Sequence, residues 1–144
     1  MILVVASGGF DPLHVGHLDY LQRAKALGDR LLVIVNSDEF LIRKKGYAFM
    51  PLAERMKVIK ALACVDIVVS GIDKDQSVCE TIRALCRSQM YPNIFANGGD
   101  RKVGGILEEE TCKELGIRIV DGLGEKVQSS SNLVKRAREF TCAS

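Results

Sequence analysis

The sequence lacks an apolar run long enough to cross a membrane, and it lacks a strong excess of one charge. No hydrophobic stretch approaches the ~20 residues that a membrane-spanning helix needs. The formal net charge of +2 at pH 7 argues against nucleic acid or an anionic membrane as a partner, although a local cluster of cations can still hold a phosphate. The first residues are apolar, without a basic leader or a cleavage site, so we expect a soluble, cytoplasmic protein.

Several signature motifs are also missing. The chain has no G-x-x-x-x-G-K-[ST] segment, which argues against a P-loop kinase or ATPase. It has no G-x-G-x-x-G after its first apolar run, which argues against a dinucleotide dehydrogenase, and no G-x-S-x-G elbow of a hydrolase. The five cysteines are odd in number and form no C-x-x-C pair, a pattern typical of buried or free thiols in a reducing compartment rather than of a zinc site.

Short apolar, β-branched runs alternate with segments of helical length along the whole chain. The runs lie at residues 2–6, 31–35, 66–70, 93–96 and 117–120, and we expect helices near 16–27, 51–63, 76–90, 106–115 and 130–140. Runs this uniformly apolar are typical of strands that helices bury on both faces. We therefore predict a single α/β domain over residues 1–144, a Rossmann-like three-layer sandwich with a five-stranded parallel sheet of order 3-2-1-4-5.

Two of the apolar runs end in a Gly-Gly turn. The first is followed by "SGGFD" at 7–11 and the fourth by "NGGDRK" at 97–102. In the predicted order, strands one and four are neighbours where the strand order reverses, and ligands of open parallel sheets bind beyond the carboxyl ends of the strands at that point. Glycine lets the backbone approach a ligand closely. The two turns are therefore expected to meet at one ligand.

The only two histidines, His14 and His17, lie three positions apart at the N-terminus of the first predicted helix. Free N–H groups and the helix dipole favour an anion there, so the two imidazoles could hold separate oxygens of a phosphate whose charge grows in a transition state. The alternative is that both rings only cap the helix and hydrogen-bond locally. A metal site is a third interpretation, but the chain has no H-E-x-x-H pattern, and the nearby acids are Asp11 and Asp19.

The segment "GGFDPLHVGH" resembles the G-x-F-D-x-x-H-x-G-H signature of the cytidylyltransferase-like nucleotidyltransferases, also called the HxGH superfamily. The matching residues are Gly8, Phe10, Asp11, His14, Gly16 and His17. A second signature of these enzymes, a hydroxyl-rich run that opens the last helix, is matched by "QSSSNLVKR" at 128–136. "KKGYAFMPLAERMKVIKALACVDIVV" and "FANGGDRK" resemble small members such as glycerol-3-phosphate cytidylyltransferase and heptose-1-phosphate adenylyltransferase.

The resemblance implies a direct displacement, in which an acceptor oxygen attacks the α-phosphorus of a nucleoside triphosphate, usually with Mg²⁺, and pyrophosphate leaves. Such chemistry needs mainly positioning and charge neutralisation from the protein. By the family pattern, His14 and His17 contact the triphosphate and its transition state. The turn at Gly8, Gly9 and Phe10, together with Gly16, borders the nucleotide, and Asp11 holds the loop or the metal.

Two basic segments are further candidates. Lys44 and Lys45 follow the second apolar run, with Gly46 as a hinge, and could form an ordinary solvated basic turn. In similar enzymes a lysine of this loop closes over the phosphates, and the sequence does not choose between the two. Arg55 lies on the next predicted helix, opposite its apolar face, where most arginines are surface charges. The family pattern makes Arg55 a candidate for binding phosphate or the acceptor.

The later candidates have equally ordinary alternatives. Gly98 could border the base and Asp100 could accept a hydrogen bond from ribose, but asparagine, glycine and aspartate also form common turns. Ser129, Ser130 and Ser131 could N-cap the last helix, bind the β- and γ-phosphates as the family pattern implies, or do both.

Residue identity does not separate CTP from ATP as the donor. The resemblance implies a small phosphorylated acceptor, such as glycerol 3-phosphate or a sugar phosphate, and a homodimer. The main alternative is a catalytically silent nucleotide-binding or regulatory module with the same fold. The intact pair of histidines with the lysine segment argues against that alternative, because a protein that only binds has less need of transition-state donors.

Overall fold

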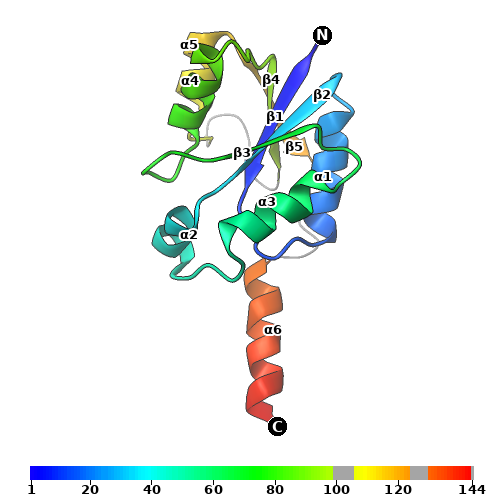
Figure 1. Cartoon of the computed structure of the whole chain (residues 1–144), viewed down its shortest axis with the longest axis vertical. Coiled ribbons are helices and arrows are strands. Elements are labelled where there is room, and N and C mark those ends of the chain that lie inside the picture. The colour runs from blue at the N-terminus through cyan, green and yellow to red at the C-terminus, as the bar shows by residue number, and fades with distance from the viewer. Residues whose placement is uncertain (99–105, 124–129, 144) are drawn as a thin grey trace.

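The computed structural model describes residues 1–98, 106–123 and 130–143 and contains a five-stranded sheet in which every pairing is parallel. The strand order is β3-β2-β1-β4-β5, as predicted. The strands are β1 (Leu3–Gly8), β2 (Arg30–Val35), β3 (Ile67–Ser70), β4 (Ile94–Gly98) and β5 (Arg118–Leu123). Strands β1 and β4 are neighbours, so the strand order reverses between them and the carboxyl ends of both point to the same edge (Figure 1).

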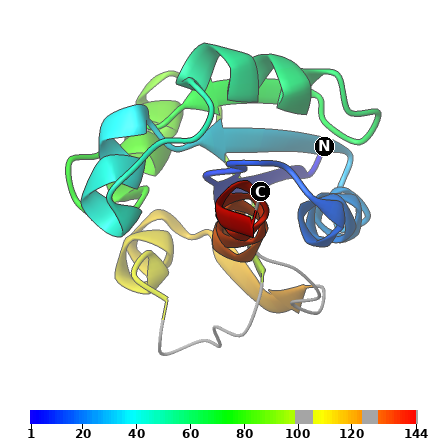
Figure 2. The same cartoon turned by 90° about the horizontal axis from the view of Figure 1, so that it is seen from below.

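Helices cover both faces of the sheet and confirm the three-layer prediction (Figure 2). The helices are α1 (Val15–Lys25), α2 (Asp38–Lys45), α3 (Leu52–Lys60), α4 (Cys79–Arg87), α5 (Glu109–Leu115) and α6 (Ser130–Ala143). Side chains of α1 and α3 pack in one core cluster, and those of α4 and α5 pack in the other. Helix α6 extends away from the carboxyl edge of the sheet (Figure 1). In the described residues no helix combines the length and hydropathy of a membrane span.

The central strands show why the apolar runs are uninterrupted. Along β2, Leu31 and Val33 belong to the cluster under α1 and α3, whereas Leu32 and Ile34 belong to the cluster under α4 and α5. All four side chains are fully buried. Because successive residues of a strand point to opposite faces, a strand covered on both sides must be apolar at every position.

Helix α2 is a correction to the sequence analysis, which expected a loop carrying the two lysines. Ser37 caps the helix by accepting a hydrogen bond from the Phe40 amide at 3.0 Å, and Gly46 ends it with a φ of 90°. Lys44 and Lys45 therefore lie in the last turn of a helix. The helix has only eight residues, and Phe40 and Leu41 are its buried positions, so it lacks the repeated apolar spacing by which the longer helices are predicted.

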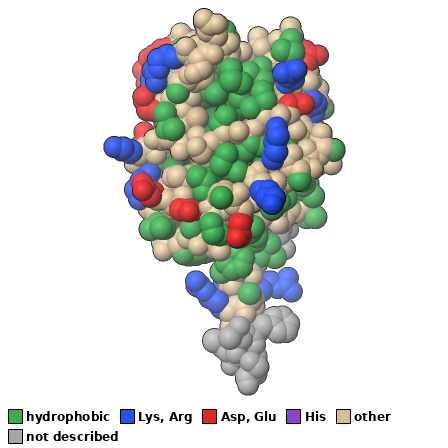
Figure 3. Space-filling view, viewed as in Figure 1, with side chains coloured by type: hydrophobic (Ala, Val, Ile, Leu, Met, Phe, Trp, Pro, Cys, Tyr) green, Lys and Arg blue, Asp and Glu red, His purple; other side chains and the backbone are tan. Residues whose placement is uncertain are grey.

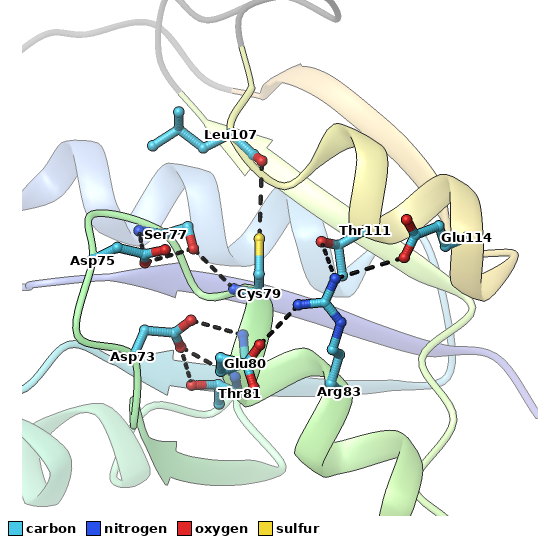
Figure 4. A network of polar contacts seen from close by, with 10 residues as sticks. All are labelled: Asp73, Asp75, Ser77, Cys79, Glu80, Thr81, Arg83, Leu107, Thr111 and Glu114. Carbon is cyan, nitrogen blue, oxygen red and sulfur yellow. Dashed lines mark hydrogen bonds and ion pairs between the residues drawn. The ribbon is translucent and has the colours of Figure 1, made fainter.

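The start of α4 is held by side-chain oxygens of the chain itself (Figure 4). The Asp73 carboxylate accepts hydrogen bonds from the amides of Glu80 at 2.7 Å and Thr81 at 3.1 Å, and from the Thr81 hydroxyl at 2.6 Å. The Glu108 carboxylate accepts another from the Val78 amide at 3.1 Å. The Cys79 amide donates to the Ser77 hydroxyl at 3.2 Å, so the free N–H groups of this helix start are paired with three carboxylate contacts and one hydroxyl contact.

The edge strand β3 is less covered than the centre of the sheet. All four of its residues are half-buried, and hydrophobic side chains gather along the middle of the face that carries this strand (Figure 3).

Candidate active site

His14 and His17 cap helix α1 reciprocally. His14 is the N-cap, and its Nδ1 accepts a hydrogen bond from the Gly16 amide at 3.1 Å, while the His14 amide donates to Nδ1 of His17 at 3.2 Å. A neutral imidazole whose Nδ1 accepts a hydrogen bond carries its own hydrogen on Nε2. The backbone network therefore assigns both rings the Nε2–H form. The predicted local capping is confirmed, and each ring keeps one donor for another partner.

The two rings stack on each other and are partly withdrawn from water. Their centroids lie 3.8 Å apart with an interplanar angle of 23°. Burial, together with smaller contributions from His14 and Lys45, lowers the pKa of His17 to about 3. Burial also lowers the pKa of His14. At neutral pH the helix start therefore presents a pair of uncharged donors.

The turn before the histidines is shaped by close packing of its own side chains. Phe10 adopts a positive φ of 52°, and its ring lies edge-on to His17 with the centroids 5.0 Å apart. A Cβ at Gly8 would lie 2.9 Å from Cζ of Phe10, and one at Gly9 would lie 2.7 Å from Cδ2 of Leu41. The Phe10 ring therefore favours glycine at position 8, whereas a side chain at position 9 would have to displace the terminal methyl group of Leu41.

Asp11 fastens the turn to the segment that follows α2. Its carboxylate is 1% exposed and accepts hydrogen bonds from the amides of Phe49 and Met50, both at 2.6 Å. The same carboxylate lies 3.4 Å from Nζ of Lys45, which donates to the Asp11 carbonyl at 3.1 Å. Of the two predicted roles of Asp11, the structure shows the one that holds a loop. In the part of the chain that the structure describes, no group of three or more metal-ligating side chains comes together.

The structure separates the two lysines. Lys45 is half-buried, lies 4.8 Å from the centre of the Tyr47 ring, and is close enough to His17 for its charge to lower the pKa of that imidazole. Lys44 is exposed, and its Nζ lies 5.9 Å from the centre of the Phe40 ring. Lys45 is therefore the lysine that the fold brings beside the histidines.

Arg55 is fully buried and ties three segments of the site together. Its Nε donates to the Met50 carbonyl at 2.8 Å, and Nη1 donates to the carbonyls of Gly9 at 2.9 Å and Asn36 at 2.6 Å. Its Nη2 donates to Oδ1 of Asp38 at 2.6 Å. The guanidinium thus fixes the position of the glycine turn and of the start of α2, a role that the sequence did not predict. Contact with the acceptor or a phosphate stays a prediction.

Of the remaining predicted residues, Gly98 lies on the β4 side of the strand reversal. Gly98 ends β4, where a Cβ would lie 2.8 Å from Cδ1 of Tyr20. Ser130 and Ser131 lie in the first turn of α6, but their side chains are outside the described part of the structure. Asp100 and Ser129 lie outside the described residues, so their predicted roles stay predictions.

Asn36 is a polar residue of the site that the sequence analysis missed. It follows the last residue of β2, is 7% exposed, and donates from its backbone amide to the Gly8 carbonyl at 2.9 Å. In the described part of the chain, its buried side-chain oxygen Oδ1 has no hydrogen-bond partner. A buried acceptor without a partner costs about 1–3 kcal/mol, so the hydrogen bonding of Asn36 is incomplete in the described part of the site.

Comparison with known proteins gives relatives that are similar over nearly the whole chain. Bifunctional protein HldE of Streptomyces coelicolor is 41% identical over 144 residues, which include 94% of this chain but only 28% of that protein. The chain therefore spans little more than a quarter of the length of that relative. FAD synthase of Pyrococcus abyssi is 35% identical over 147 residues, which include 98% of this chain and 95% of that protein.

A solved structure shows the same arrangement. The lipopolysaccharide core biosynthesis protein from Thermoplasma volcanium superposes with a TM-score of 0.70 at 29% identity, over 86% of this chain and 98% of that one. The cytidylyltransferase-like family matches residues 5–136, which include the glycine turn, the histidine pair, α2 and Arg55. The chain belongs to the cytidylyltransferase-like family of nucleotidyltransferases.

Proposed function

We propose that this protein transfers a nucleoside monophosphate, CMP or AMP, from a nucleoside triphosphate to a small phosphorylated acceptor and releases pyrophosphate. The observation that carries the proposal is the histidine pair at the start of α1. Both Nδ1 atoms are occupied by backbone amides, so the two stacked rings, whose centroids lie 3.8 Å apart, each keep a neutral Nε2–H donor for a ligand. The free N–H groups of the helix and its dipole favour a phosphate at the same place.

The reaction requires no protein nucleophile. An oxygen of the acceptor forms a bond to the α-phosphorus, the bond from that phosphorus to the bridging oxygen breaks, and pyrophosphate carries away the electron pair. Negative charge on the phosphoryl oxygens increases on the way to the transition state. The Nε2–H donors of His14 and His17 and the ammonium of Lys45 would stabilise this charge without reorganisation, because the capping network and Asp11 already hold them in place.

In the proposed reaction, Mg²⁺ is bound mainly by the triphosphate substrate. The Asp11 carboxylate is already occupied by two amides and Lys45, so in the described residues it offers little room for a metal. Mg²⁺ is commonly held by substrate phosphates with few protein ligands. We propose that it enters with the triphosphate and partly neutralises the phosphate charge.

The acceptor would lie beside the turn on the β2 side. The unpartnered Oδ1 of Asn36 is buried, so we propose that this side chain turns toward the acceptor and accepts a hydrogen bond from its hydroxyl or amide group. The similarity to FAD synthase suggests FMN as one phosphorylated acceptor to test with ATP, because FAD is FMN joined to AMP. Glycerol 3-phosphate and sugar phosphates are the other acceptors of the proposed class.

The nucleotide would lie on the β4 side. Gly98, Asp100 and the serines at 129–131 remain the proposed contacts to the base, ribose and outer phosphates. A homodimer in the cytoplasm completes the proposal, and sedimentation of the purified protein would measure the oligomeric state.

A pyrophosphate-release screen tests the proposed function. CTP and ATP are each combined with glycerol 3-phosphate, a panel of sugar phosphates and FMN, in buffer containing MgCl₂. One donor–acceptor pair that releases pyrophosphate in proportion to the enzyme supports nucleotidyl transfer and identifies both substrates. Nucleotide binding without pyrophosphate release from any pair would favour the alternative, a nucleotide-binding module that does not catalyse the reaction.

A further inference from the structure

Strands β1 and β4 separate before either of them ends. Within the described residues they pair at Val4 with Ile94 and at Val5 with Phe95. On its other side, β1 stays paired with β2 as far as Gly8. Each strand continues for three residues beyond its last pair, as far as Gly8 and Gly98. The two central strands therefore diverge toward their carboxyl ends, where the strand order reverses.

The hydroxyl of Tyr20 lies between the diverging strands. It accepts a hydrogen bond from the Ser7 amide at 3.2 Å and donates to the Ala96 carbonyl at 2.7 Å. If the pairing continued in register, Ser7 would lie opposite Asn97, and in a parallel ladder its amide would then point to the Ala96 carbonyl. The hydroxyl thus takes the place of one hydrogen bond of the ladder and bridges the two groups that the bond would join.

The surrounding structure fixes the tyrosine in this place. Tyr20 is buried on α1, one turn after His17, and its ring packs against the backbone of β4. A Cβ at Gly98 would lie 2.8 Å from Cδ1 and 3.0 Å from Cγ of the ring, so the ring needs a glycine there. The helix that presents the histidines therefore also carries the group that separates the strands.

We propose that Tyr20 is a positioning residue whose hydroxyl holds the carboxyl ends of β1 and β4 apart at the width that admits the nucleotide. The inference rests on the proposed function, because it assigns the opening to the nucleotide whose phosphates lie on the histidines. In open parallel sheets this crevice is where ligands bind. Because Tyr20 bridges both strands from α1, the position of the opening is fixed relative to His14 and His17. The same helix therefore positions the nucleotide and the proposed catalytic side chains.

The test compares Tyr20→Phe with Tyr91→Phe, which removes a hydroxyl from a side chain that is 65% exposed. In Tyr20→Phe the Ser7 amide loses the hydroxyl that accepts its hydrogen bond. The phenyl ring still lies between the strands, so the Ala96 carbonyl cannot replace that acceptor. Amide exchange at Ser7 is expected to become at least about tenfold faster in Tyr20→Phe, since a lost hydrogen bond corresponds to roughly that factor. The Kd and KM for ATP or CTP are expected to rise about tenfold, with kcat changed less than about threefold.

A second variant, Gly98→Ala, places a methyl group against the ring and is expected to produce the same pattern without removing the hydroxyl. Gly98→Ala provides the test of Tyr20 if Tyr20→Phe does not fold. Circular dichroism and the Tm of each variant show whether the fold is kept, and Tyr91→Phe is expected to match the unmodified protein in every readout.

The outcomes separate this inference from the proposed function. Nucleotide Kd values within twofold of the unmodified protein in the folded variants, or unchanged exchange at Ser7 in Tyr20→Phe, would overturn the role of Tyr20. The unmodified protein could bind ATP or CTP and yet release no pyrophosphate with any of the tested acceptors. The proposed function then fails, and the Kd and exchange data still decide the role of Tyr20. If it binds neither nucleotide, both proposals fail.

Discussion

Helices α1 and α4 each follow a strand of the sheet, yet they satisfy their free N–H groups in opposite ways. At α4 most of the partners are carboxylate oxygens, with Asp73 accepting from the amides of Glu80 and Thr81 (Figure 4). At α1 the partners are the neutral Nδ1 atoms of His14 and His17. Both solutions meet the same backbone requirement.

The difference lies in what each helix start leaves for a ligand. A carboxylate accepts hydrogen bonds and adds negative charge, so the start of α4 is stable but repels a phosphate. An imidazole caps with one nitrogen and presents a donor on the other. The first turn of α1 also contains no acidic residue, whereas that of α4 contains Glu80. Under the proposed function, the chemistry of the cap is what makes the start of α1 a phosphate site and the start of α4 a structural one.

The largest expected effect comes from removing the imidazole donors. His14→Ala and His17→Ala are each expected to lower kcat by about 10² or more, the scale of losing one preorganised donor to a transition-state charge. The measurement is pyrophosphate release with the active substrate pair. Gln22→Ala, at an exposed position of the same helix, serves as the control. Turnover that is unchanged in both histidine variants would refute the catalytic role.

Exchanging one kind of cap for the other separates the two functions of His14. Aspartate is a good N-cap and its charge suits a helix start, so His14→Asp is expected to keep the Tm within a few degrees. Its negative charge and missing donor are expected to reduce kcat at least as much as alanine does. A variant that loses stability and activity in parallel would show that the ring serves only the helix.

The corresponding change at α4 is expected to affect stability and not catalysis. Asp73→Ala leaves two amides and the Thr81 hydroxyl without their acceptor, which should lower the free energy of unfolding by about 1–3 kcal/mol. Urea denaturation measures this change. Turnover of the folded variant is expected to stay within about threefold of the unmodified protein, and a large loss of kcat would contradict the purely structural assignment of this helix start.

The two lysines of α2 should differ in the same assay. Lys45→Ala removes the cation beside His17 and leaves the Asp11 carboxylate without its ion-pair partner, so the site becomes more negative and kcat/KM is expected to fall by about tenfold or more. Lys44→Ala is the matched control from the adjacent position and is expected to stay within about threefold. Equal losses in both variants would show that the phosphates are held by a diffuse charge rather than by Lys45.

The smallest expected effect is a pH dependence that distinguishes the two regions. Burial lowers the pKa of His17 to about 3 and also lowers that of His14, whereas unfolded histidines titrate near 6.5. Below that pH the unfolded chain binds more protons, so the free energy of unfolding should fall as pH decreases from 6.5 to 5. The slope is at most about 1.4 kcal/mol per pH unit for each histidine.

The α4 region should respond only in more acid solution. Hydrogen bonds from Ser77 lower the pKa of Asp75 below its ordinary value of 3.8, so this contribution is present above that pH and lost as the carboxylate is protonated. Urea titrations at a series of pH values measure the free energy of unfolding in both pH ranges. His17→Gln should reduce the slope of this free energy against pH between 6.5 and 5. An unfolding free energy that is flat across that interval would contradict the buried, neutral state of the histidines.

The sheet was predictable because its strands must be apolar at every position. Val33 and Ile34 point to opposite clusters and are both fully buried, and an uninterrupted β-branched run is the direct consequence. Helix α2 was missed because its stability comes from a serine cap and from contacts of Phe40 and Leu41 rather than from a repeating apolar face. Short helices of this kind depend on their surroundings.

At the site, the histidines were predictable and their supports were not. The position of His14 and His17 before a periodic helix indicates a helix start, and the family signature indicates phosphate. Arg55 looks like a surface charge in the sequence, yet it is 1% exposed and donates to three carbonyls, of which those of Gly9 and Asn36 are distant in the sequence. Tyr20 looks like one more core residue. Their roles depend on which segments fold together, which residue spacing does not reveal.

The central claim is that both imidazoles are neutral, protonated on Nε2, and donate to the nucleotide's phosphates. Nitrogen-15 spectra of the imidazole rings test it most directly, because the chain has only two histidines. At pH 7 we predict that both rings show the Nε2–H form and that the Nε2 signals shift when ATP or CTP is added. Charged rings, hydrogens on Nδ1, or Nε2 signals that do not respond to either nucleotide would contradict the account.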